Sequence, residues 1–263
     1  MEFKSYIIFF LLLSYSCKND KDLIQDCYTK DGTLFSLLEP AYTHVDFTNN
    51  LTYTEAFNTY TYRNFYNGGG VAIGDLNNDG LPDLFFCGNM VSNRLYLNQG
   101  NLKFKDYTEQ CELNSLGVWS TGVSLVDING DEWLDIYICK SGKPDGDKRH
   151  NELFINQGLS ENGNYPVFKE MSKTYRIADY GLSTHAAFFD FDKDNDLDMY
   201  LLNNSIKSIG NYDLSKDQRL VRDPNGGNKL YRNDGGSFTD VSESAGIYGS
   251  AIGFGLGVTI GDI

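Results

Sequence analysis

One sequence unit occurs three times in this chain, and this internal repeat restricts the possible folds more than any other feature. Each copy consists of a short apolar segment, a nine-residue loop rich in Asp and Asn, and a second apolar segment. The loops begin at Asp75, Asp127 and Asp190, so successive units are 52 and 63 residues apart. Units of this length are typical of repeat architectures such as propellers, in which neighbouring units complete each other's hydrophobic core.

Each unit predicts four β-strands. The first is apolar and precedes the loop: Val71–Gly74, Val123–Val126 and Ala186–Phe189. The second is continuously apolar, as expected for a strand covered on both faces: Leu84–Cys87, Ile136–Cys139 and Met199–Leu202. The third has Asn at both ends: Asn93–Asn98, Asn151–Asn156 and Asn228–Asn233. A turn follows, since Asn and Gly both tolerate positive φ, and the fourth strand begins at Phe104, Phe168 or Phe238.

Four short strands joined by tight turns make one propeller blade. We therefore predict an all-β chain that forms a partial β-propeller of four-stranded antiparallel blades. The blades are expected at residues 67–116, 117–180 and 181–250, and residues 251–263 repeat the start of a unit, as a fourth blade cut off at its loop. Because three blades cannot close a ring, we expect the chain to be the N-terminal fragment of a longer protein.

Residues 33–66 precede the first blade and are expected to contain a further strand. Phe35–Glu39 resembles the outer strand Phe104–Thr108. Such a strand could join the last blade and close the ring, which would remove free sheet edges.

The three loops carry oxygen side chains at positions 1, 3, 5 and 9, and this spacing predicts calcium sites. These residues are Asp75, Asn77, Asp79 and Asp83; Asp127, Asn129, Asp131 and Asp135; and Asp190, Asp192, Asp194 and Asp198. A backbone carbonyl is expected from position 7, which is Leu81, Trp133 or Asp196. Without a cation, two carboxylates roughly 4 Å apart repel by about 4 kcal/mol at an effective dielectric constant near 20. We therefore predict about three bound Ca²⁺ ions.

Metal-free turns, EF-hands and metals other than calcium agree less well with the loop sequences. Asp and Asn also favour metal-free Asx turns, but three copies of one four-oxygen spacing favour a metal. An EF-hand requires Glu at position 12 and flanking helices, whereas position 12 is apolar here and the flanks are predicted strands. Zinc is disfavoured because the loops contain no Cys or His, and magnesium because no octahedral set is apparent. Position 6 requires a sharp turn, which suits Gly80 and Asn195 but not Glu132, so the second site is the weakest.

The N-terminus has the features of a secretory signal, because Lys4 precedes an apolar run that is too short to span a bilayer. We predict a signal peptide at residues 1–16 and a polar tether at residues 17–32. Cys17 follows Ser16 as in the lipobox of bacterial lipoproteins, and its lipid would be the chain's one link to the membrane. Tyr15 departs from the lipobox, so ordinary cleavage and secretion are the alternative. Either way the chain is expected to be exported, at the bacterial cell envelope or beyond it.

Four cysteines follow Cys17. Cys87 and Cys139 each lie four residues after the last Asp of a loop, where the third unit has Leu202. This position predicts a small apolar core residue rather than a disulfide. A disulfide between Cys27 and Cys111 is left open.

The loop Asp75–Asp83, the Asn-x-Leu-Tyr-x-Asn strands and the segment Phe238–Ile247 together resemble the FG-GAP/VCBS repeats of integrin-α-like propellers. The nearest resemblance is to cartilage-acidic-protein-like proteins with an ASPIC/UnbV domain. The resemblance extends from about Phe35 to the end, and it implies a seven-bladed propeller with calcium in the loop between the first two strands of a blade. The chain departs from that pattern by stopping after three blades, without a C-terminal ASPIC/UnbV domain.

Charge limits the expected partners, because a formal net charge of −14 repels nucleic acid and anionic membranes. Two long insertions, Ser141–His150 and Asn203–Gly227, are predicted on the face opposite the calcium loops. Their basic residues are Lys143, Lys148, Arg149, Lys207, Lys216, Arg219 and Arg222. They are candidate contacts for an unknown protein or glycan at the cell surface, and solvated, mobile insertions are the alternative. We predict a non-enzymatic, calcium-binding adhesion or recognition scaffold.

The competing class is an enzyme, as the propeller portion of a secreted carbohydrate-active lyase or hydrolase. The three histidines, His44, His150 and His185, lie in different elements, and no Gly-x-Ser-x-Gly nucleophile motif is present. No catalytic residue is therefore predicted. His185 replaces a Gly that the other units carry at this place, and it is expected either in the core or facing the central channel.

Overall fold

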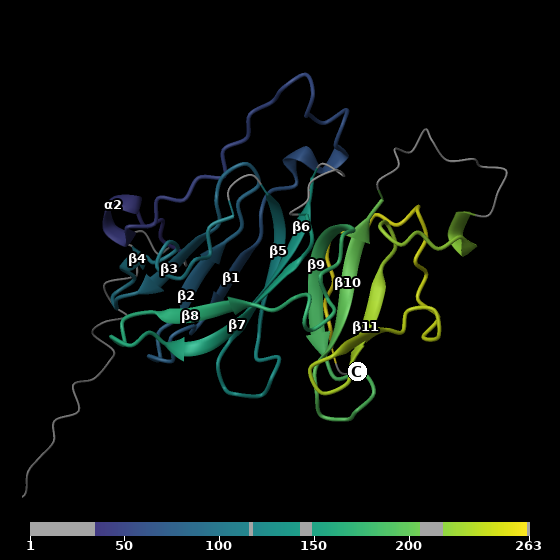
Figure 1. The fold of residues 1–263 in the computed structure, drawn as a ribbon. Coiled ribbons are helices and arrows are strands. Elements are labelled where there is room, and N and C mark those ends of the chain that lie inside the picture. Colours follow the sequence, from purple (N-terminus) through teal and green to yellow (C-terminus); the bar gives the residue numbers. More distant parts are fainter. Residues whose placement is uncertain (1–34, 116–117, 143–148, 206–217, 262–263) are drawn as a thin grey trace, which may run out of the picture. The chain divides into compact units, whose positions relative to one another are not determined.

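The structure, a computed structural model, describes residues 35–115, 118–142, 149–205 and 218–261 (Figure 1). The predicted signal peptide, tether and lipidated Cys17 lie outside the described residues, as does Cys27. The chain divides into two compact units, residues 1–39 and 40–263. In the first unit, Phe35–Glu39 does not form a β-strand, and its pairing with a last blade stays a prediction.

The described residues of the second unit form twelve strands in three four-stranded antiparallel sheets. The first sheet contains β1 (Val71–Gly74), β2 (Asp83–Phe86), β3 (Arg94–Asn98) and β4 (Phe104–Asp106). The second contains β5 (Trp119–Val126), β6 (Asp135–Ser141), β7 (Glu152–Leu159) and β8 (Pro166–Glu170). The third contains β9 (Leu182–Phe189), β10 (Asp198–Asn204), β11 (Lys229–Asn233) and β12 (Phe238–Asp240). The strands of each sheet follow one another in chain order, which confirms the predicted all-β partial propeller.

Helical structure is confined to short turns in the part of the chain that the structure describes. These are α2 (Pro40–Thr43), η1 (Arg63–Tyr66) and η3 (Gln218–Leu220). None of the described helices has the length and apolar character needed to cross a membrane.

All three loops have the same register. The last residue of the first strand pairs with the Asp that closes the loop: Gly74 with Asp83, Val126 with Asp135, and Phe189 with Asp198. Each acidic loop is therefore the tip of a hairpin between the first two strands of a blade. Because strands flank the loops on both sides, the fold is inconsistent with an EF-hand.

Asparagine side chains fix both ends of the third strand. At its start, Oδ1 of Asn93, Asn151 and Asn228 accepts a hydrogen bond from the backbone N–H of Gly88 (3.0 Å), Lys140 (2.8 Å) and Asn203 (3.1 Å). At its end, Nδ2 of Asn98, Asn156 and Asn233 donates to the carbonyl of Pro82 (2.9 Å), Leu134 (3.2 Å) and Leu197 (3.2 Å). The repeated Asn residues thus hold the strand to both hairpin ends.

In the turn after the third strand, Asn and Gly have different roles. Oδ1 of the closing Asn accepts from the N–H of Gly100 (2.9 Å), Gly158 (3.0 Å) or Gly236 (2.8 Å). These glycines have φ of +85°, +80° and +90°, whereas the closing Asn residues are not in the left-handed region. The predicted turn is therefore present, with the Gly at positive φ and the Asn acting through its side chain.

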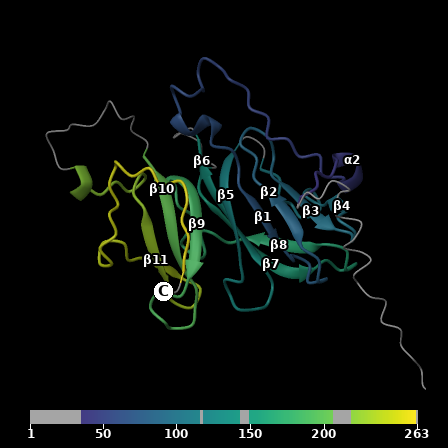
Figure 2. The ribbon, with the colours of Figure 1, turned by 180° about the vertical axis from the view of Figure 1, so that it is seen from behind.

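The hydrophobic core lies between neighbouring blades. Phe85, Cys87 and Leu95 of the first sheet pack with Ile136 and Ile138 of the second. In the same way, Tyr137, Cys139 and Leu153 pack with Met199 and Leu201 of the third. The first strands β1, β5 and β9 lie next to one another, as the opposite views of Figures 1 and 2 show.

The core confirms the predicted role of two cysteines. Cys87 and Cys139 are buried free thiols, and Leu202 occupies the matching buried place in the third unit. Cys111 is also a buried free thiol.

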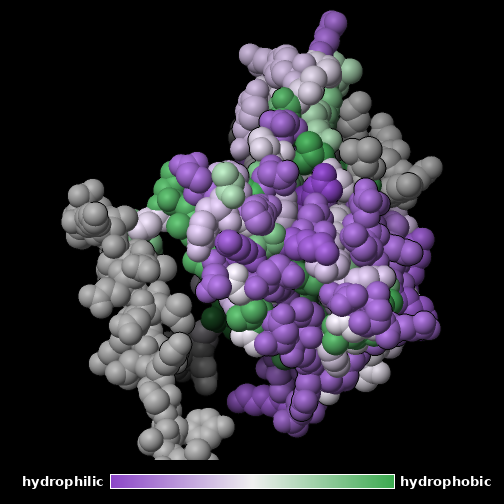
Figure 3. Space-filling model, turned by 90° about the vertical axis from the view of Figure 1, so that its left-hand side faces the viewer, coloured by the Kyte–Doolittle hydropathy of each residue, from purple (hydrophilic) through white to green (hydrophobic). Residues whose placement is uncertain are grey.

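The side of the molecule that carries β4 and α2 is mainly hydrophilic, with apolar residues scattered over it (Figure 3).

The segment before the first blade adds an aromatic cluster instead of the expected strand. Within residues 35–66 the structure has α2 and η1 and no β-strand. Phe57, Tyr62 and Phe65 pack against Trp119 of β5 and Leu182 of β9. The ring centroids of Phe57 and Trp119 are 5.2 Å apart, with the rings nearly perpendicular. This segment therefore covers one end of two neighbouring blades.

The residues after the third blade repeat a contact between blades. Thr121 of β5 donates its hydroxyl to the carbonyl of Ser183 at 2.7 Å, and Thr184 of β9 donates to the carbonyl of Gly255 at 3.0 Å. Gly255 thus lies against the third blade as Ser183 lies against the second. The described residues 257–261 form no strand, and the predicted loop residue Asp262 lies outside the described part.

Candidate metal loops

The Asp at position 1 shapes each loop by accepting hydrogen bonds from backbone amides. Oδ1 of Asp75, Asp127 and Asp190 accepts from the N–H at position 5, at 3.1, 3.0 and 3.2 Å. Oδ2 accepts from the N–H at position 6, at 2.7, 2.9 and 3.1 Å. The loop therefore curls around this carboxylate in all three units.

The Asp at position 9 is buried in every unit and joins the hairpin to the third strand. Oδ2 of Asp83, Asp135 and Asp198 accepts from the N–H at position 2, at 2.8, 3.1 and 2.9 Å. Oδ1 accepts from the N–H of the Asn that closes the third strand, at 2.8 Å in each unit. These residues were predicted as metal ligands only, and the loop spacing does not reveal this second, structural role.

Burial changes the titration of the position-9 carboxyls. It raises the pKa of Asp83 and of Asp135 to about 6, although the two amide hydrogen bonds act in the opposite direction. The aspartates at positions 1 and 5 raise these pKa values further. Burial likewise raises the pKa of Asp198. A cation beside these carboxyls would favour their ionised forms.

Positions 1, 3 and 5 converge at the tip of each loop. In the third loop, carboxylate oxygens of Asp190, Asp192 and Asp194 all lie within 4.8 Å of one another. In the other two loops position 3 is Asn, whose Nδ2 donates to Oδ2 at position 5, at 3.0 Å from Asn77 and 2.9 Å from Asn129. Such a group of oxygens from one short loop suits a hard cation such as Ca²⁺.

Position 7, where the loop spacing predicts a backbone carbonyl ligand, has a different side chain in each unit. The side chains of Leu81 and Trp133 cannot bind Ca²⁺. Asp196 accepts the N–H of Gly235 at 3.1 Å through Oδ2, so this oxygen already has a partner within the fold. The carbonyl oxygen is the one group that all three residues share.

Two positions in each loop have left-handed backbone, and one of them was not predicted. At position 6, Gly80, Glu132 and Asn195 have φ of 84°, 69° and 75°. Glu132 therefore adopts the unfavourable conformation that its loop requires, and the second loop keeps the shape of the others. At position 4, Asn78, Gly130 and Lys193 have φ of 55°, 71° and 65°. Lys193 concealed this requirement in the sequence.

The residues present fit a calcium ion in each loop. The side chains at positions 1, 3, 5 and 9, together with the carbonyl at position 7, are those that would hold it, and water would complete the six to eight oxygens that Ca²⁺ takes. The position-9 carboxylates keep unshared electron pairs after their amide contacts, since each oxygen accepts one N–H. The third loop thus has its oxygens at positions 1, 3 and 5 already close together, without Asp198, and a cation would relieve the repulsion of these carboxylates.

The part of the sequence that contains the first two loops has a known counterpart. Residues 75–138 match the family model of an FG-GAP-like repeat. The FG-GAP-like segment begins at the first loop Asp, and it runs through β2 to β5 and the second loop into β6. The segment thus agrees with the FG-GAP part of the resemblance, while the ASPIC/UnbV part stays a prediction.

A relative resembles more of the chain than the FG-GAP-like segment. The T-cell immunomodulatory protein homolog of Plasmodium yoelii yoelii is 27% identical over 176 residues, which cover 60% of this chain and 23% of the relative. The chain therefore spans less than a quarter of that protein's length.

Most of the basic residues predicted in the two insertions fall outside the part of the chain that the structure describes. These are Lys143, Lys148, Lys207 and Lys216, and nothing is described of the side chain of Arg219. Arg222 is exposed and donates to the carbonyl of Ile247 at 2.7 Å. Arg149 is only 8% exposed, so it does not belong to a basic surface.

The histidines remain apart, as the sequence indicated. His150 lies between blades in a cavity that Glu152, Glu170 and Lys173 also line. His185 is half-buried at the first strand of the third blade and lines a different cavity. The favoured expectation of a packed core histidine is therefore not met, because the side chain of His185 is only half-buried and borders a cavity.

Proposed function

We propose that the protein is a calcium-stabilised recognition module without enzymatic activity, with one Ca²⁺ in each acidic loop. The observation that carries this proposal is the threefold recurrence of one loop geometry, with Asp at positions 1, 5 and 9, the same amide hydrogen bonds to positions 1 and 9, and the same register. Metal-free Asx turns would explain the amide contacts of position 1, but they do not require the convergence of positions 3 and 5 on it.

Calcium would act as a structural ion in these loops. The loops join adjacent strands of one blade rather than two mobile helices, so binding is expected to stiffen the hairpin tips without switching the fold. Extracellular calcium modules bind with dissociation constants of about 10⁻⁴ to 10⁻³ M. At about 10 mM calcium, each site would then contribute about 1.4 to 2.7 kcal/mol to the free energy of unfolding.

Thermal melting tests this proposal. Three sites together are expected to raise Tm by at least about 8 °C in 10 mM calcium relative to calcium-depleted buffer. The triple variant Asp79→Asn, Asp131→Asn and Asp194→Asn removes the position-5 charge from every loop and is expected to lose most of this shift. The matched control neutralises three exposed acids outside the loops, by Glu109→Gln, Glu161→Gln and Glu243→Gln, and is expected to keep it. An equal calcium shift in both triple variants would contradict the proposal.

The same proposal places the protein outside the cytoplasm. It rests on the predicted signal peptide and Cys17, and on an acidic chain that disfavours nucleic acid as a partner. The module would be tethered to the bacterial envelope through lipid on Cys17, and it would bind a protein or glycan at the cell surface. Metabolic labelling with palmitate should mark the wild-type chain and leave a Cys17→Ala variant unlabelled. Equal labelling of both chains would contradict the lipid anchor.

A further inference from the structure

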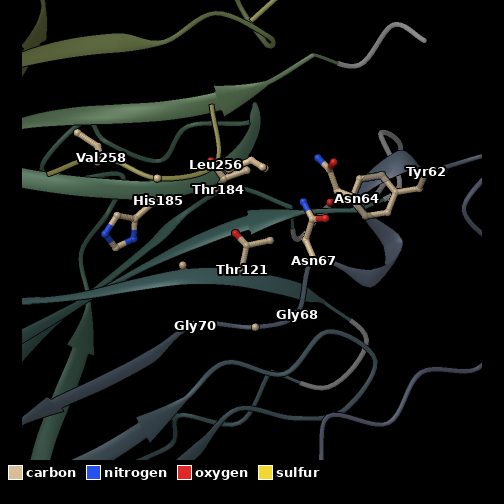
Figure 4. Close-up of a pocket in the computed structure, with 13 residues that line it drawn as sticks. Tyr62, Asn64, Asn67, Gly68, Gly70, Thr121, Thr184, His185, Leu256 and Val258 are labelled. Atoms are coloured by element: carbon tan, nitrogen blue, oxygen red, sulfur yellow. The ribbon is translucent and has the colours of Figure 1, made fainter. Parts of the chain in front are cut away.

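A cavity of about 530 Å³ lies where the first strands of the three blades approach one another (Figure 4). Its lining comes from Thr121 and Gly122 of β5, from Thr184 and His185 of β9, from residues 256–258, and from six residues before β1: Tyr62, Asn64, Asn67, Gly68, Gly69 and Gly70. All of these residues are within the described part of the chain. The volume is within the range of roughly 300 to 1,000 Å³ that is typical of small-molecule sites.

The lining of this cavity is uncharged, in contrast to the rest of the protein. No Asp, Glu, Lys or Arg occurs among the described residues that line it, although the chain has a net charge of −14. A charged ligand would lose its hydration without gaining an ionic partner, which is costly. The cavity therefore favours a neutral ligand over phosphates, metal ions and charged peptides.

His185 stands at a position where the other two blades have glycine, which has no side chain. A Cβ on Gly70 would lie 2.7 Å from the carbonyl oxygen of Thr121, and a Cβ on Gly122 would lie 2.4 Å from that of Thr184. Glycine is therefore required where one blade's first strand touches the next. At the third blade the residue is His185, and its imidazole extends into the cavity (Figure 4). Its Nδ1 also lies 2.9 Å from the place that a Cβ on Gly122 would take, so the imidazole borders the second blade as well as the cavity.

The cavity offers neutral hydrogen-bonding groups of both kinds. The hydroxyls of Thr121 and Thr184 donate to carbonyls of the wall, so their oxygens can accept from a ligand. The side chains of Asn67 and His185 make no hydrogen bond to any other residue that the structure describes. Burial lowers the pKa of His185, so the neutral ring offers one donor and one acceptor.

Apolar groups complete the lining. The ring of Tyr62 is held in place, because its hydroxyl donates to Ser141 Oγ at 2.8 Å and the ring stacks on Phe57 at 5.6 Å. Leu256 and Val258, from the segment after the third blade, contribute aliphatic surface to the lining (Figure 4). Neutral donors and acceptors beside fixed apolar surface match a sugar ring, which presents hydroxyls at its edge and C–H groups on its faces.

We propose that this cavity binds a neutral monosaccharide unit of a glycan, with Asn67 and His185 as direct contacts. The inference rests on the proposed recognition function and specifies the class of its partner. Binding is not expected to require the calcium loops as ligands, since they lie at the hairpin tips and do not line the cavity.

Saturation-transfer NMR on the 263-residue chain in millimolar calcium tests this proposal. The probes are glucose, galactose, mannose and N-acetylglucosamine, with glucuronic acid and glucosamine as charged counterparts. At least one neutral sugar is expected to bind, and more tightly than either charged one. Absence of binding by all four neutral sugars, or preference for a charged one, would overturn the proposal.

Two variants locate the sugar. His185→Gly introduces the residue that the other blades carry, and Asn67→Ala changes an exposed side chain, so both are expected to fold as judged by Tm. Each should weaken binding about tenfold, which corresponds to about 1.4 kcal/mol. Tyr60→Ala in the same segment is the control, because Tyr60 is 91% exposed and does not line the cavity. Unchanged binding in both cavity variants would reject the site.

The two proposals can fail separately. A calcium-dependent Tm without sugar binding would reject the sugar site and leave the calcium module standing. If sugar binding depends on His185 but calcium does not change Tm, only the calcium module would be rejected.

Discussion

At the scale of single residues, the buried aspartates at position 9 connect pH to stability. The pKa of Asp83 and of Asp135 is about 6 in the folded protein, against 3.8 for an ordinary carboxyl. As pH rises from about 4 to about 6, the unfolded chain has released protons that the folded protein still holds. The metal-free folded state therefore loses stability across this window because of these two groups.

This effect can be isolated by comparing the wild type with the Asp83→Asn, Asp135→Asn variant. In calcium-depleted buffer, the free energy of unfolding of the wild type minus that of the variant is expected to fall as pH rises from about 4 to about 6. Urea unfolding at several pH values measures the difference, in which contributions from histidines cancel. A difference that rises with pH would show that the carboxyls are not raised in pKa.

Glu132 carries a local conformational cost. Its φ of 69° is at a position where the other loops have Gly or Asn. Glu132→Gly should therefore raise the free energy of unfolding by about 1 kcal/mol. The control Glu132→Gln removes the charge and keeps the strained backbone, so it should give little of this gain. Denaturant unfolding decides between them, and equal effects of the two substitutions would assign the cost to charge instead of φ.

Much of the residue-level site could be predicted from spacing, and particular parts could not. The convergence of positions 1, 3 and 5 follows from the loop pattern. The left-handed position 4 was concealed because Lys193 occupies it in one copy, and the backbone contacts of Asp83 depend on the third strand, which is distant in sequence. Long-range hydrogen bonds of this kind leave no local periodicity.

At the scale of elements, the third strand is the part that joins each blade together. Asn98 and Asn156 hold equivalent turns and hairpins, but Asn156 makes one more contact: its Nδ2 also donates to the carbonyl of Leu76 in the neighbouring blade, at 2.9 Å. Asn98→Ala is expected to cost about 1 to 2 kcal/mol of unfolding free energy, and Asn156→Ala about 1 kcal/mol more. Denaturant unfolding of both variants measures this, and a smaller cost for Asn156→Ala would contradict the role of the contact between blades.

The strands themselves were predictable because each has a consistent apolar pattern in three copies. The segment before the first blade was not, since Phe57, Tyr62 and Phe65 form a cluster through contacts with β5 and β9 instead of through a strand. An aromatic-rich segment without alternation does not indicate which distant residues it covers.

At the scale of the whole molecule, the first strand β1 exposes apolar residues. Val71 and Ile73 are 55% and 66% exposed, whereas Val123 in the matching place of β5 is buried against the first blade. An exposed apolar strand face favours self-association. The variant Val71→Thr, Ile73→Thr is expected to lower the apparent mass of the chain in concentrated solution by light scattering, while Tyr60→Ala leaves it unchanged. If both variants associate to the same extent, β1 is not part of the interface between chains.

Equilibrium dialysis with radioactive calcium measures whether each blade holds one calcium ion in its acidic loop, as we propose. We predict three ions per chain, with dissociation constants of about 10⁻⁴ to 10⁻³ M. One ion fewer is predicted for each of Asp79→Asn, Asp131→Asn and Asp194→Asn. Absence of saturable binding at millimolar calcium, or three ions still bound by the triple variant, would contradict calcium binding at these loops.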